Sequence, residues 1–274
     1  MKQTTFFWLL LLVAVLGILL YGPTVSLPLF LDDASNFRWL TPTNGLDVWI
    51  TAGGFPFYRP LPFTLFKLLW HLQGGYHAPT LHALVVAIHL VNALLVGLLA
   101  SRLLRRRAGN VAALLMLVFP FSYQAVALVG SIFHLILVTG TVGAALFGLH
   151  YLRARARWAL LGAWIAAFCG TFSHENGVMI PALVGLIAVV ALRGMNEAAA
   201  PHKEGASRSA PTSLWHTIAE HRRSLVLLLG PMVIIAAGYF ALWLFVPKAN
   251  DATGLLLADL DAKIAYFAQG LVYP

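Results

Sequence analysis

Long apolar runs, separated by short charged or polar breaks, recur along the 274-residue chain and constrain what it can fold into. A bilayer core of about 30 Å requires roughly 20 apolar residues as an α-helix. With 60% hydrophobic and only 10% charged residues, the chain lies far from the composition of a soluble domain. The runs are continuous and not alternating, which favours helices over a barrel. We therefore predict an all-α polytopic membrane protein with about seven transmembrane helices, over residues 5–22, 79–101, 109–123, 127–151, 158–173, 177–192 and 224–246.

The charged residues separate by sign between alternate breaks. Thirteen of the 18 basic residues are Lys2 and those within 102–107, 153–157, 193–208 and 222–223, whereas seven of the ten acids fall in the other breaks. Because basic loops mark the cytoplasmic face, we expect a cytoplasmic N-terminus, an extracytoplasmic active face and a plasma (inner) membrane location. The net charge of +8 then reflects topology and attraction to the lipid bilayer, and we expect no nucleic acid partner.

Two of the breaks are unusually long. Residues 23–78 form the first extracytoplasmic loop and carry eight aromatic residues before residue 64, so we expect them to fold against the membrane. Within this loop, Pro62–Leu72 reads as an interfacial helix, too short to span, with Thr64, Lys67 and His71 on one polar stripe. Residues 193–223 are rich in small and polar side chains and predict a flexible cytoplasmic loop.

Five polar side chains within or between the predicted spans are candidates for the polar groups of a cavity. His82 and His89 lie seven residues apart and share one helix face with Asn92; we favour interhelical hydrogen bonding for them over a ligand role. His174 and Glu175 fall between spans five and six, each about 15 residues long and therefore about 22 Å in rise. This turn should be recessed below the surface, where Glu175 is either functional or a helix cap.

Five fragments in order carry a resemblance to a known family. They are Leu31-Asp32-Asp33-Ala34-Ser35-Asn36, Tyr58-Arg59-Pro60-Leu61, the helix with His82 and His89-Leu90-Val91-Asn92, Phe119-Pro120 through Gln124-Ala125-Val126, and Ser173-His174-Glu175-Asn176-Gly177. Together they resemble the type C glycosyltransferases, most of all the protein O-mannosyltransferase-like and tetratricopeptide-linked mannosyltransferase branches. The resemblance implies a single transmembrane glycosyltransferase-like domain over residues 1–274. Such an enzyme moves a sugar from a polyprenyl-phosphate donor to a protein, lipid or glycan acceptor outside the cytoplasm.

The resemblance also implies roles for individual residues. The catalytic carboxylate of the family maps onto Asp32 or Asp33, its outer-loop arginine before a proline onto Arg59, and its later acidic residue onto Glu175. The sequence departs from the family pattern at two places. Where the family often has Gly-Arg-x-Asp, this chain has Gly130-Ser131-Ile132-Phe133-His134, and where a lysine is common before the glutamate, it has His174. Family members usually continue through further spans, so we expect a fragment or a reduced member.

The chemistry of such a transfer requires a base for the acceptor hydroxyl and cations for the departing phosphate. We predict Asp32 as the base and Asp33 as the group that orients it or the sugar, with the reverse assignment left open. Arg59 and Lys67 are candidates for the donor phosphate, although anchoring to lipid headgroups explains them almost as well. A divalent cation held by Asp32 and Asp33 is a further option, and no other metal site is predicted.

Two functions from other classes compete with a transferase. A transporter or flippase would use His82, His89 and Glu175 as an intramembrane polar path, and proton-coupled uptake would reveal it. A non-catalytic membrane scaffold would not need the outer acids, so it would tolerate Asp32→Asn and Asp33→Asn.

Overall fold

The computed structural model describes residues 3–53, 55–119, 122–199 and 214–248. Within these ranges all regular structure is helical. The long helices are α1 (Gln3–Tyr21), α4 (Ala78–Leu103), α5 (Arg106–Val118), α7 (Ile132–Ala154), α8 (Arg157–Thr171), α9 (Ile180–Ala199) and α11 (Arg222–Phe245). The short ones are η1 (Gly22–Ser26), α2 (Asp32–Leu40), η2 (Asp47–Trp49), α3 (Pro60–Gln73), α6 (Ser122–Ala127), η3 (Val129–Ser131), η4 (Glu175–Met179) and α10 (Leu214–Glu220).

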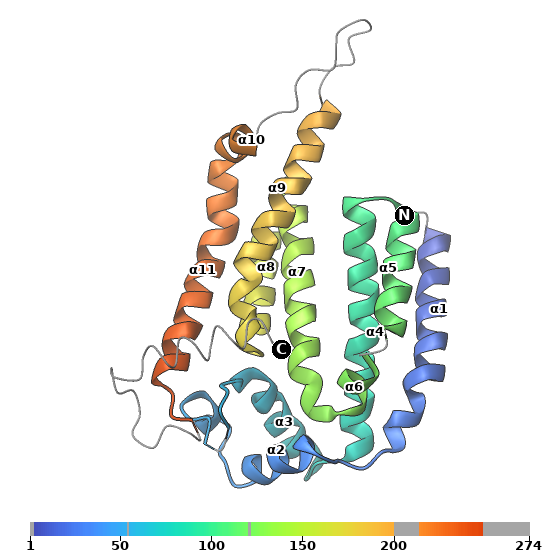
Figure 1. Ribbon diagram of the computed structural model, residues 1–274, viewed down its shortest axis with the longest axis vertical. Coiled ribbons are helices and arrows are strands. Elements are labelled where there is room, and N and C mark those ends of the chain that lie inside the picture. The colour runs from blue at the N-terminus through green and yellow to red at the C-terminus, as the bar shows by residue number, and fades with distance from the viewer. Residues whose placement is uncertain (1–2, 54, 120–121, 200–213, 249–274) are drawn as a thin grey trace, which may run out of the picture.

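The long helices form an elongated bundle that confirms the predicted class of a helical, multi-pass membrane protein (Figure 1). Four segments in the described ranges are long and apolar enough to cross a membrane: Ala78–Leu103, Val129–Ala154, Glu175–Met195 and Arg222–Phe245. The other three predicted spans coincide with α1, α5 and α8. With 13 and 15 residues, α5 and α8 rise only about 20 and 22 Å. The count of seven spans therefore stays a prediction.

Two of the predicted boundaries were wrong. The sixth span is not short, because η4 and α9 together give a 21-residue apolar helical stretch from Glu175 to Met195. The loop predicted over 193–223 is helical at both ends, since α9 continues to Ala199, α10 covers Leu214–Glu220 and α11 begins at Arg222. Residues 200–213 lie outside the described part of the chain. Polar composition alone did not reveal that both flanking helices extend beyond their apolar runs.

Small residues bring neighbouring helices close together. A Cβ on Gly140 of α7 would lie 2.6 Å from the Cα of Gly170 in α8, and a Cβ on Gly97 of α4 would lie 2.7 Å from the Cβ of Ala113 in α5. Such contacts are how helices pack where lipid removes the usual hydrophobic driving force. Large apolar side chains such as Leu161, Leu186 and Ile234 face outward instead. An apolar exterior of this kind suits a bilayer and not water.

The helices of the first long loop form a layer across one end of the bundle, the lower end in Figure 1. Backbone hydrogen bonds link this layer to the bundle: Leu61 N–H donates to Phe172 O at 3.2 Å, and Ala52 N–H donates to Pro247 O at 3.0 Å. The Tyr239 hydroxyl on α11 adds a bond to Tyr58 O at 2.7 Å. The N-terminal end of α1 lies at the opposite end of the bundle. These bonds fix the layer over the ends of α8 and α11, and the candidate site lies beside them at the start of α7.

Candidate functional site

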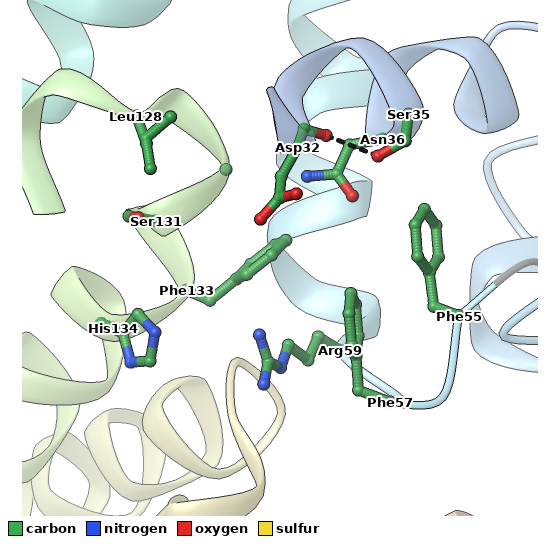
Figure 2. A pocket seen from close by; sticks show the side chains of 11 residues that line it. Asp32, Ser35, Asn36, Phe55, Phe57, Arg59, Leu128, Ser131, Phe133 and His134 are labelled. Atoms are coloured by element: carbon green, nitrogen blue, oxygen red, sulfur yellow. Dashed lines mark hydrogen bonds between the residues drawn. The ribbon is translucent and has the colours of Figure 1, made fainter. Parts of the chain in front are cut away.

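A cavity of about 200 Å³ lies where the outer layer meets the start of α7 (Figure 2). Its lining comes from α2, from the segment before α3, and from η3 with the first turn of α7. The lining residues are Asp32, Ser35, Asn36, Phe55, Phe57, Arg59, Leu128, Gly130, Ser131, Phe133 and His134. Ligand pockets usually measure about 300–1,000 Å³, so this one is sized for a small polar group and not for a whole lipid.

Asp32 and Asp33 face different surroundings although they are adjacent. Asp32 is exposed and lines the cavity, and its side chain makes no hydrogen bond within the described residues. Asp33 is fully buried, and its carboxylate accepts hydrogen bonds from Gly130 N–H at 2.5 Å and Val129 N–H at 3.3 Å. Burial raises the pKa of Asp33 above 3.8, against the opposing effect of these backbone donors. Asp32 is thus available to a ligand, whereas Asp33 holds η3 against α2.

The backbone around this pair is unusually constrained. Leu31, directly before Asp32, has a φ of 51° without being glycine, and its side chain is 72% exposed. Such a conformation costs about 1–3 kcal/mol and is retained only where the surroundings impose it. A Cβ on Gly130 would lie 2.8 Å from Asn36 Nδ2 and 3.2 Å from Asp33 Oδ1. The α2–η3 contact therefore requires glycine at 130 and fixes where Asp32 enters the cavity.

Arg59 supplies the positive charge of the cavity and contacts one carboxylate and two aromatic rings. Its Nε and Nη2 donate to Glu175 Oε2 at 3.0 and 2.9 Å, and its guanidinium lies 4.2 Å from the Phe57 ring centroid and 5.1 Å from that of Phe133. Pro60 follows Arg59 at the first position of α3, where a proline starts a helix without losing a hydrogen bond. Figure 2 shows the Arg59 guanidinium and the Asp32 carboxylate on opposite sides of the Phe133 ring. The cavity thus has an acidic end and a basic end.

Two histidines adjoin the basic end. His134 on α7 lines the cavity, and its ring centroid lies 4.5 Å from that of the buried His174. His174 Nδ1 accepts the Asn176 N–H at 3.1 Å and lies 3.4 Å from Glu175 Oε2. This second contact would be an ion pair only for a protonated ring. Burial, together with the charge of Arg59, lowers the pKa of His174 to about 2, so we assign it as neutral with its proton on Nε2.

Lys67 does not line the cavity. It is 6% exposed, its ammonium donates to Thr41 O at 3.2 Å, and it lies 5.7 Å from the Trp70 ring centroid. Thr41 caps the C-terminal end of α2, where a cation is favourable for the helix dipole. The predicted polar stripe on this helix is therefore not free for lipid: its lysine faces α2, and Thr64 accepts the Trp49 Nε1–H at 2.9 Å.

The three candidate residues of α4, which are His82, His89 and Asn92, also lie away from the cavity lining. The Asn92 amide donates to Leu135 O at 2.8 Å and accepts the Thr139 hydroxyl at 2.7 Å. His89 Nε2 lies 3.4 Å from Leu117 O, and its ring packs edge-on against Tyr21. His82 is fully buried with neither ring nitrogen hydrogen-bonded within the described residues. Asn92 and His89 thus make the interhelical bonds that the sequence favoured, and we refer to them as the bundle seam.

The predicted divalent-cation site at Asp32 and Asp33 does not fit this arrangement. Both oxygens of Asp33 accept backbone N–H donors, which directly compete with a cation. In the part of the chain that the structure describes, no three His, Cys, Asp or Glu side chains form a group that could hold a metal ion. We therefore derive no step through a metal.

Sequence reasoning missed His134, the aromatic wall of Phe55, Phe57 and Phe133, and the polar contributions of Ser35 and Asn36. Only the Gly130–His134 segment carried a signal, as a departure from a family pattern. The other residues look like ordinary members of apolar or loop segments.

The fold and the site together define a multi-pass helical membrane protein with a small, charged cavity at one end of its bundle. No protein-family model, curated protein or solved structure matches the chain.

Proposed function

We propose that this protein is an integral-membrane glycosyltransferase that moves a sugar from a polyprenyl-phosphate donor to an acceptor at the extracytoplasmic face. The observation that carries the proposal is the cavity itself, which combines a carboxylate without a side-chain hydrogen bond among the described residues, a guanidinium and an aromatic wall. In this proposal the outer layer faces away from the cytoplasm of a plasma (inner) membrane, because basic loops mark the opposite end.

The transfer is a single displacement at the anomeric carbon. The Asp32 carboxylate takes the proton of the acceptor hydroxyl while the acceptor oxygen bonds to that carbon. The bond from the anomeric carbon to the phosphate oxygen breaks, and its electron pair goes to the phosphate, whose charge Arg59 stabilises. Asp33 acts as a positioning residue, because its hydrogen bonds to η3 hold the start of α2, and with it Asp32, in place. This geometry predicts inversion of the anomeric configuration.

A second cavity supports the lipid nature of the donor. This groove of about 530 Å³ lies between η4, α9 and α11. It is lined only by apolar residues, which are Val178, Pro181, Ala182, Leu229, Val233, Ala236, Ala237 and Phe240. Val178 lies three residues after Glu175, which binds Arg59. An isoprenoid chain in this groove would therefore end close to the basic side of the small cavity.

The test is transfer by the reconstituted protein from a panel of polyprenyl-phosphate sugars to lipid, glycan and peptide acceptors. We expect turnover with at least one donor and an inverted product. A retained configuration would contradict single displacement. Absence of both donor binding and turnover across the panel would contradict the transferase, and proton-coupled uptake by the same vesicles would favour a transporter instead.

A further inference from the structure

His134 is a polar residue of the cavity to which the proposed mechanism gives no role. It lies in the first turn of α7 and lines the cavity, and Figure 2 shows its ring on the same side of Phe133 as the Arg59 guanidinium. Its ring contacts His174, but it makes no hydrogen bond within the described residues. An imidazole that reaches a polar cavity without a protein partner has an N–H donor and an acceptor available to a ligand.

The neighbours of His134 decide what kind of ligand group it faces. Arg59 is the only basic side chain among the residues that line this cavity, so an anionic group belongs at that end. Both donated hydrogen bonds of Arg59 go to the same oxygen of Glu175. Glu175 thus offsets the charge of Arg59 and occupies two of its five N–H donors, so a further donor beside Arg59 would strengthen the binding of an anion there.

His174 explains how His134 is held at that place. Its Nδ1 accepts the Asn176 N–H, which fixes the ring in the turn between α8 and η4. The two rings lie 4.5 Å apart at an angle of 41°. His174 thereby packs against the His134 ring, and His134 also lines the cavity.

We infer that His134 is a second phosphate-binding residue, whose N–H donates to an oxygen of the donor phosphate beside Arg59. This inference rests on the proposed function and extends it: phosphate recognition combines a guanidinium, partly neutralised by Glu175, with a neutral imidazole. It assigns the basic end of the cavity to a single phosphate group, and leaves the Asp32 end to the sugar and the acceptor.

The experiment measures binding of a polyprenyl monophosphate without sugar to the full chain in phosphatidylcholine nanodiscs. We expect His134→Ala to raise the dissociation constant about 10- to 100-fold, since hydrogen bonds to charged groups have that weight. His134→Gln keeps an N–H donor and should lie between the two. The matched control is His150→Ala, at the cytoplasmic end of the same helix under the proposed orientation, which should bind within about twofold of wild type.

The outcomes separate the inference from the function on which it rests. Wild-type affinity in His134→Ala, with sugar transfer intact in the wild type, would overturn the role of His134 alone. If the wild type binds no polyprenyl monophosphate, the proposed function and this inference fail together. Thermal unfolding of each variant identifies misfolding, and if the alanine variant does not fold, the glutamine variant decides.

Discussion

The cavity and the bundle seam are both polar regions in a largely apolar molecule, but they differ in how their polar groups are satisfied. In the seam, Asn92 uses its amide twice, once to a backbone carbonyl and once to the Thr139 hydroxyl. In the cavity, the side chains of Asp32 and His134 make no hydrogen bond within the described residues. Polarity inside a membrane protein therefore does not by itself mark a site, whereas unsatisfied polarity that faces a cavity does.

Asp32 and Asp33 repeat this contrast within two adjacent residues. Asp33 is satisfied by the backbone of η3 and fully buried, while Asp32 is exposed in the cavity. One carboxylate therefore maintains the geometry that the other uses.

Asp32→Asn should have the largest effect on activity. Removal of a general base lowers turnover by about 10²–10⁴-fold. Because the Asp32 side chain has no protein partner within the described residues, the unfolding temperature should stay within about 2 °C of wild type. Sugar transfer and thermal unfolding measured on the same preparation check both expectations, and full activity in this variant would remove Asp32 from the mechanism.

Glu175→Ala should have the largest effect on stability. It leaves the Arg59 guanidinium half-buried without its partner, which for a buried pair costs about 3–5 kcal/mol. The free energy of unfolding in mild detergent is the measurement. An unchanged stability would mean that the ion pair does not hold the outer layer to the bundle.

His174→Gln should change the pH dependence of stability. The folded-state pKa of about 2 lies below the ordinary value of 6.5, so the folded protein binds fewer protons than the unfolded chain. The contribution of His174 is therefore complete above pH 6.5 and is lost as pH falls towards 2. Unfolding temperatures between about pH 7.5 and 4.5 should fall less steeply in His174→Gln than in wild type.

Asn92→Ala should affect stability but not chemistry. Interhelical hydrogen bonds in membrane proteins contribute about 0.6 kcal/mol on average and at most about 1.7. Two such bonds predict a modest decrease in unfolding temperature and wild-type transfer per folded molecule. Transfer reduced more than tenfold would move the seam into the functional site.

Lys67→Met should have the smallest effect on phosphate binding. Lys67 is buried against α2 and donates to Thr41 O, so a side chain of similar volume should replace it with little change. We expect affinity for a polyprenyl monophosphate within about twofold of wild type. A tenfold loss would show that Lys67 leaves its partner to reach the ligand.

Much of the fold could be predicted because apolar runs of membrane length have few structural alternatives to an α-helix. Helices occur at all seven predicted ranges. Their lengths were less predictable: α5 stops at Val118, before the end of its apolar run, and α9 continues into polar sequence up to Ala199. Hydropathy alone does not set these ends: Pro120 follows α5, and a proline disfavours the helical conformation of the residue before it.

The candidate site was only partly predictable. The Asp pair and Arg59 could be singled out by residue type and position, but successive residues of a helix point about 100° apart, so sequence alone could not say which acid faces the cavity. Lys67 looked exposed because the helix that buries it, α2, lies in a loop without a strong periodic signal. His134 was overlooked as a cavity residue because one histidine in an apolar run carries no sign of what it faces.

The most direct test compares Asp32→Asn with Asn92→Ala in one experiment, with transfer per folded molecule and unfolding temperature measured for both. We expect a crossed result, in which Asp32→Asn loses transfer and keeps its stability while Asn92→Ala loses stability and keeps transfer. If Asp32→Asn transfers sugar as the wild type does, the cavity is not the catalytic site and the proposed mechanism is wrong.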